Sequence, residues 1–70
     1  MTHRFVVDIP FDNKETGARG QQWLWVQAED KLQARAVALQ EAAGETATRH
    51  RYGAVLVLND PTRPIEVSAG

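Results

Sequence analysis

Apolar and polar residues alternate along two segments near the N-terminus, and this pattern predicts two β-strands. Between Arg4 and Phe11 one face is wholly apolar, which is the period-2 pattern of a half-buried strand. The segment Gln21–Ala28 is predicted to be the second strand. Asp12–Gly20, between them, is polar and contains two glycines. It predicts a hairpin loop, so we expect the two strands to pair antiparallel.

Two tryptophans, Trp23 and Trp25, stand one residue apart in the second of these strands. Side chains of a strand alternate between its faces, so the two indoles share one face, and Leu24 and Val26 share the other. Both faces of this strand are apolar, yet the sequence predicts only one helix, which can cover only one face of the sheet. We expect Trp23, Trp25 and Val6 to form an exposed partner-binding patch on the face away from the helix. In the alternative register, the indoles face an alanine-rich helix.

The residues after Asp30 predict an amphipathic helix. Asp30 is a good N-cap, because its carboxylate can accept hydrogen bonds from the free amides of the first turn. Gln33 lies three residues on and can complete a capping box. Gly44 is expected to end the helix in a left-handed conformation. The apolar stripe expected to face the sheet consists of Leu32, Ala36, Leu39 and Ala43.

The remainder of the chain predicts two further strands. Glu45–Arg51 is polar without a clear period and predicts a connector. Tyr52–Leu58 is mostly apolar, which favours a central strand buried on both faces. Asn59–Pro64 is a turn with two prolines, and Ile65–Val67 is a short last strand.

Together these elements predict one domain, residues 1–70, of the α+β class. The order is ββαββ, and the simplest sheet is antiparallel with four strands in the order 2-1-3-4 and one helix on one face. Phe5, Leu39 and Leu56 are expected in the core.

Composition excludes several classes of function. The chain has 70 residues, a net charge of −1 and 43% hydrophobic residues, so it folds and has no strong charge bias toward nucleic acid or an anionic membrane. It has no cysteine, and its two histidines are far apart without a third ligand. We therefore expect no metal and no cofactor. A core this small rarely supplies more than ~3–5 kcal/mol, so oligomerisation, as a homodimer or with a protein partner, is the remedy that the sequence leaves, although many domains of this length fold alone.

The sequence shows neither a membrane segment nor a catalytic site. Its apolar runs are too short to cross a bilayer, and the N-terminal residues lack the core of a signal peptide. We therefore expect a complete cytoplasmic protein with no membrane partner. Its one serine, Ser68, lies in the C-terminal tail, and no nucleophile is paired with a base. The sequence predicts that the protein is not an enzyme.

One basic and aromatic cluster gives a second interpretation. Arg49, His50, Arg51 and Tyr52 are consecutive, and with Arg19 they form a possible stacking patch for single-stranded nucleic acid. A solvated connector is the simpler interpretation, because phosphate binding needs a local excess of cations and the chain is slightly acidic.

The sequence thus favours a small non-catalytic binding protein that acts through protein–protein contact, either by self-association or by docking to a partner protein. The small size and the alanine- and arginine-rich composition suggest a bacterial source, or a phage or mobile element. The alternative function is a small nucleic-acid-binding module that uses the arginine and aromatic cluster.

Overall fold

A computed structural model describes all 70 residues, and it contains four strands and two helices. All strand pairs are antiparallel, and the sheet has the order β2-β1-β3, with β4 also paired to β1. The predicted α+β class and antiparallel sheet are confirmed. The elements are β1 (His3–Asp12), β2 (Arg19–Ala28), α1 (Lys31–Ala42), α2 (Glu45–His50), β3 (Val55–Leu56) and β4 (Glu66–Ala69).

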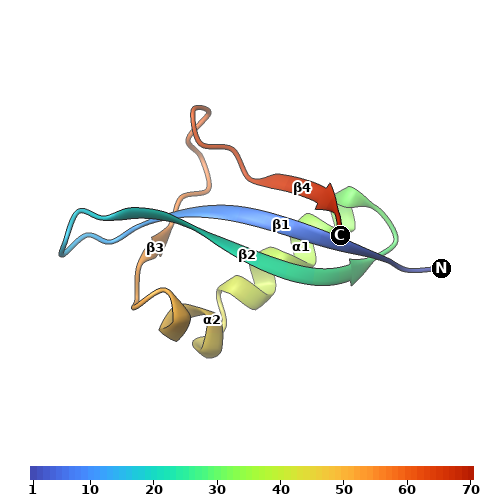
Figure 1. Ribbon diagram of the computed structural model, residues 1–70, viewed down its shortest axis with the longest axis horizontal. Helices are drawn as coiled ribbons and strands as arrows, with labels where there is room; N and C mark the ends of the chain where they lie inside the picture. Colours follow the sequence, from blue (N-terminus) through green and yellow to red (C-terminus); the bar gives the residue numbers. More distant parts are fainter.

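Strand β4 differs in one detail from the simplest arrangement, in which it would lie beside β3. Both strands instead flank the same edge of β1, with β3 opposite Phe11 and Asp12 and β4 opposite the segment Phe5–Asp8. The loop between them carries the chain outward and back (Figure 1). Since β3 is only two residues long, it offers β4 no ladder to extend. Arg63 fixes the loop, because its Nη1 donates to Asp12 Oδ1 at 2.7 Å.

The β1–β2 hairpin has ten residues in each strand and a turn closed by Asn13. Asn13 Oδ1 accepts hydrogen bonds from the N–H groups of Glu15 at 2.9 Å and Thr16 at 3.1 Å. An asparagine side chain that binds the backbone two or three residues on stabilises a turn of this kind. Gly17 has φ 74°, a left-handed conformation that glycine adopts without strain.

Helix α1 begins as predicted but does not end as predicted. Asp30 Oδ1 accepts from the Gln33 N–H at 2.8 Å, and Gln33 Oε1 accepts from the Glu29 N–H at 2.6 Å. The N-cap is therefore confirmed. The left-handed ending at Gly44 is wrong: Ala43 is the C-cap, and Gly44 has φ −71° and begins the next helix. That helix, α2, replaces the polar connector expected in this segment.

The face that α1 turns to the sheet is not the predicted one. Ala34, Ala38 and Ala42 lie at i, i+4 and i+8 and are fully buried. Alanine has no side-chain atom beyond Cβ, so this stripe lets the helix approach the sheet closely. The stripe predicted from the sequence is wrong, because Leu32, Ala36 and Ala43 are exposed and Leu39 is only half-buried. That prediction favoured the large leucines over the small alanines.

The predicted strand Tyr52–Leu58 is much shorter in the structure. Tyr52 and Gly53 have φ values of 55° and 76°, so the chain turns sharply where a strand was expected. Only β3 remains, at the end of β1 rather than in the centre of the sheet. The apolar run after Leu56 instead enters the loop to β4.

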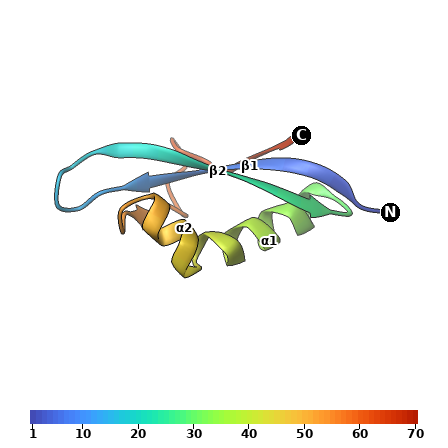
Figure 2. The ribbon, with the colours of Figure 1, turned by 60° about the horizontal axis from the view of Figure 1, so that its bottom comes forward.

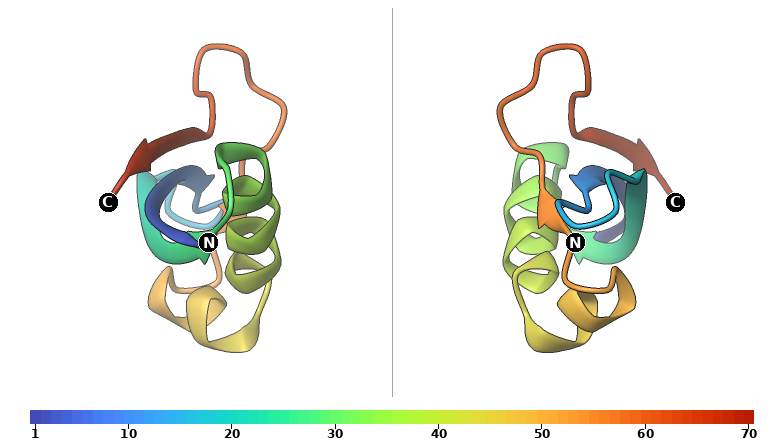
Figure 3. Two further views of the ribbon diagram at one scale, coloured as in Figure 1. Left: turned by 90° about the vertical axis from the view of Figure 1, so that its right-hand side faces the viewer. Right: turned by 90° about the vertical axis from the view of Figure 1, so that its left-hand side faces the viewer.

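The core lies between the sheet and α1, while the other face of the sheet has no helix over it (Figures 2 and 3). Phe5 is in the core as predicted, and Leu39 and Leu56 pack at its margin. Neither helix has the length and apolar content needed to cross a membrane. The buried cluster consists of Phe5, Val7, Ile9, Val26, Ala28, Ala34, Ala38 and Ala42.

Candidate functional site

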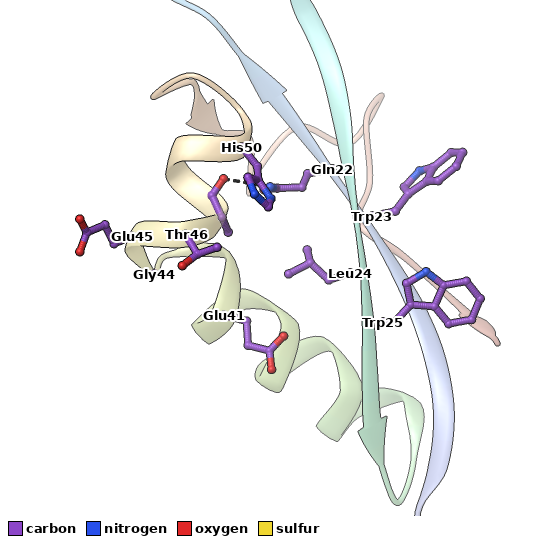
Figure 4. A pocket seen from close by; sticks show the side chains of 10 residues that line it. Gln22, Trp23, Leu24, Trp25, Glu41, Gly44, Glu45, Thr46 and His50 are labelled. Carbon is purple, nitrogen blue, oxygen red and sulfur yellow. Dashed lines mark hydrogen bonds between the residues drawn. The ribbon is translucent and has the colours of Figure 1, made fainter.

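The two tryptophans lie on the face of the sheet away from the helices. In Figure 4 both indoles project from one side of β2, while Gln22 and Leu24 project from the other side toward the helices. Trp23 is 68% exposed and Trp25 is 61% exposed. The predicted placement is confirmed, and the reversed register, with the indoles against the helix, is wrong.

We call the surface around these indoles the open face, and it spans three strands. Trp25 and Ser68 flank Val6, and Trp23 and Glu66 flank Asp8. These side chains line a cavity of about 370 Å³ on the open face. The six residues of the open face are Val6, Asp8, Trp23, Trp25, Glu66 and Ser68.

On this side of the sheet, Arg4 has an aromatic partner, whereas the carboxylates of Asp8 and Glu66 have no cationic partner. The guanidinium carbon of Arg4 lies 5.5 Å from the centroid of the Trp25 ring, within cation–π range. Asp8 and Glu66 form no ion pair, since the two ion pairs of the molecule are Arg49–Glu45 and Arg63–Asp12. Asp8 Oδ1 is covered and accepts no hydrogen bond. The cavity therefore contains two carboxylates without a cationic partner.

The outer edge of β2 has no strand beside it. From Gly20 to Ala28 this edge strand has neither a charged residue nor a proline, which are the usual protection against pairing with another chain. A second cavity, of about 460 Å³, lies between this edge and the corner where α1 meets α2 (Figure 4). His50 and Glu41 are among its lining residues. Within the fold, the outward backbone groups of β2 therefore have no strand partner.

Arg51, which belonged to the predicted nucleic-acid patch, is instead part of the structural framework. Its Nε donates to Ala54 O at 2.7 Å, and its Nη1 donates to Ala42 O at 2.6 Å and to Gln22 Oε1 at 3.1 Å. Burial lowers the pKa of the Arg51 guanidinium, because it removes water from the cation. These donors join α1, β2 and the segment before β3, so they are not available to a phosphate.

The structure does not bring the other members of that patch together. Arg49 pairs with Glu45 at 3.0 Å, and Tyr52 is 90% exposed beside it. His50 lines the cavity at the β2 edge, whereas Arg19 lines a separate one with Arg63. The single basic and aromatic patch inferred from consecutive residues is therefore wrong as a geometric unit.

Asp8, Glu66 and Ser68 are the residues of the open face that the sequence did not predict. Asp8 had a readable signal, because alternation along β1 places it on the same face as Val6. Glu66 and Ser68 had none, since their positions depend on the pairing of β4 with β1. No group of three or more histidine, aspartate or glutamate side chains is arranged to hold a metal.

Comparison with protein-family models, with curated proteins and with solved structures gives no match.

Proposed function

We propose that this chain is a small non-catalytic binding protein that acts through protein–protein contact, by self-association or by docking to a partner protein. The observation that supports the proposal is the exposure of two neighbouring indoles on a sheet face that no helix covers. Tryptophan is enriched among the residues that dominate binding energy at interfaces. Burying a large apolar side chain contributes roughly 1.5–3 kcal/mol, so covering Trp23 and Trp25 favours association.

The β2 edge adds a second route to the same kind of contact. A homodimer can form by antiparallel pairing of two β2 edges or by stacking of two open faces around a two-fold axis. Either arrangement uses the strand that carries both tryptophans. A cytoplasmic location is part of the same proposal.

The test compares the parent with the double variant Trp23→Ser, Trp25→Ser. Leu32→Ser is the matched control, because Leu32 is 78% exposed on α1, away from the open face. Sedimentation velocity over a range of concentrations measures self-association, and circular dichroism checks folding. We expect the double variant to associate less than the parent while it keeps its helix signal, and the control to behave like the parent.

If the parent stays monomeric, an N-terminally tagged form tests the docking branch. Proteins captured by the parent, and lost with the double variant but kept with the control, are purified and their affinity is measured pairwise. Equal affinity for parent and double variant contradicts the proposal. Salt-sensitive binding to single-stranded oligonucleotides, weakened by Arg49→Ala, supports the nucleic-acid alternative instead.

A further inference from the structure

We propose that the open face binds an arginine side chain from a basic segment of a partner protein. The guanidinium would lie in the cavity between the indoles of β2 and the carboxylates of Asp8 and Glu66. The inference rests on the proposed function, because it names the chemistry of the partner that the same face contacts. Three features of the cavity support it, namely its charge, its aromatic wall and its hydrogen-bonding capacity.

The charge of the cavity favours a cation. Asp8 and Glu66 are directly opposite each other on adjacent antiparallel strands. Like charges in that position destabilise a sheet, and neither carboxylate has an ion pair within the fold. Arg4, which shares a face of β1 with Asp8, lies over Trp25. A cation from a partner would therefore relieve a repulsion that the free protein retains.

The aromatic wall favours a cation that can stack. A guanidinium is attracted to the face of an indole, and the contact of Arg4 with Trp25 shows that this sheet face already accommodates such a pair. Trp23 is directly opposite Asp8 and has no cation over its ring. A guanidinium in the cavity can thus contact an indole and a carboxylate at the same time.

The hydrogen-bonding capacity favours arginine over other cations. An ionised carboxylate only accepts hydrogen bonds, and Glu66, directly opposite Asp8, is exposed and has no ion pair within the fold. The Glu66 carboxylate can therefore accept from an incoming donor, whereas Asp8 Oδ1 is covered and contributes through its charge. Arginine presents a planar set of N–H donors that matches a carboxylate in a bidentate way, whereas a quaternary ammonium has no donor. A second copy stacked through its open face fits this cavity less well, because it brings the same two carboxylates, so the arginine site serves docking to a partner protein rather than face-to-face self-association.

The test uses a blocked peptide in which arginine and alanine alternate, titrated into the full chain at low salt. Binding is followed by NMR through the backbone amide signals and the two indole N–H signals. The comparison peptide replaces each arginine with citrulline, which keeps the shape and removes the charge. We expect the arginine peptide to shift the signals of the open face and the citrulline peptide to bind at least about tenfold more weakly.

The matching protein variant is Asp8→Asn with Glu66→Gln, and Glu15→Gln in the hairpin loop is the control. We expect the double variant to lose affinity for the arginine peptide by about tenfold or more, while the control binds like the parent. A second readout concerns folding alone: the double variant should melt at a higher temperature than the parent, because the repulsion between the carboxylates is gone.

Failure of this inference is distinguishable from failure of the proposed function. If the arginine peptide does not bind, or binds equally well to the carboxylate variant, the arginine site is overturned. If protein association is then still lost with the tryptophan variant, the open face remains an interface of different chemistry. If both the arginine peptide and protein association are unaffected by the tryptophan variant, both proposals fall.

Discussion

The two faces of the β1–β2 hairpin carry large apolar side chains in very different surroundings. On the helix side, Val7 and Ile9 are fully buried beneath a stripe of alanines from α1. On the open face, Trp23 and Trp25 are the largest side chains of the chain and remain more than half exposed. The same two strands therefore serve as core on one side and as surface on the other.

The difference shows how a chain of 70 residues divides its apolar side chains. β-branched residues and alanines pack into a thin, close layer, which needs little volume to exclude water. The bulky indoles lie instead on the opposite face, which no helix covers. Stability is thus concentrated on one face, and the other is free to carry residues suited to contact.

The largest effect is expected from a pair of substitutions that separates the two faces directly. Val7→Ala removes two methyl groups from a fully buried site and should lower the free energy of unfolding by about 2–3 kcal/mol. Val6→Ala makes the same change one residue away on the open face and should cost less than about 1 kcal/mol. Urea denaturation of the two variants measures the difference. Equal losses would mean that both faces are packed in the free protein.

A smaller effect is expected from the arginine that supports the helix side. Arg51→Met keeps the apolar stem but removes the donors to Ala42 O and Ala54 O. Leaving such buried acceptors without partners should cost about 1–3 kcal/mol. Arg49→Met is the control, since Arg49 is exposed and pairs only with Glu45. Thermal unfolding, followed by circular dichroism, measures the stability of the two variants. Equal melting temperatures would show that the Arg51 hydrogen bonds do not contribute to stability.

A still smaller loss of stability is expected when the N-cap of α1, the helix that covers the sheet, is removed. Asp30→Ala removes the acceptor for the Gln33 N–H and should cost about 0.5–2 kcal/mol. The neighbouring change Lys31→Ala leaves the cap intact and should be close to neutral. The urea concentrations at the midpoint of unfolding are compared for the two variants and the parent, provided that the slope of the unfolding free energy with urea is unchanged. An unshifted midpoint for Asp30→Ala would contradict a role of the cap in stability.

The smallest effect concerns the loop that brings β4 to the open face. Hydrogen bonds from the Thr62 hydroxyl at 2.7 Å and its N–H at 2.9 Å hold the pKa of Asp60 below its ordinary value. A carboxyl with a lowered pKa stabilises the fold above its unfolded pKa, and that contribution is lost as the pH falls through the folded value. An NMR titration should place the Asp60 midpoint below that of a free aspartate. Thr62→Val should raise the midpoint, and an unmoved midpoint would refute the assignment.

The parts of the fold that sequence predicted well depend on local patterns. Alternation located β1 and β2, and the cap at Asp30 located the start of α1, because each signal lies within a few neighbouring residues. The alanine stripe was missed, since a small side chain gives a weak apolar signal even where it makes the closest contact. The pairing of β4 with β1 depends on how the loop around Arg63 folds back, which no periodicity encodes. Trp23 could be placed on the open face because alternation within β2 is a local signal. Glu66 could not, because its place depends on the long-range pairing of β4 with β1.

The placement of the tryptophans has a practical consequence for spectroscopy. Both indole fluorophores lie on the open face, and the buried core contains none. Emission from this protein should therefore be that of solvated indole even in the native state. It should shift to shorter wavelength when the open face is covered, so the unlabelled chain is its own fluorescent sensor of occupancy. Unfolding followed by the same emission should give only a weak signal, because the fluorophores are already in water.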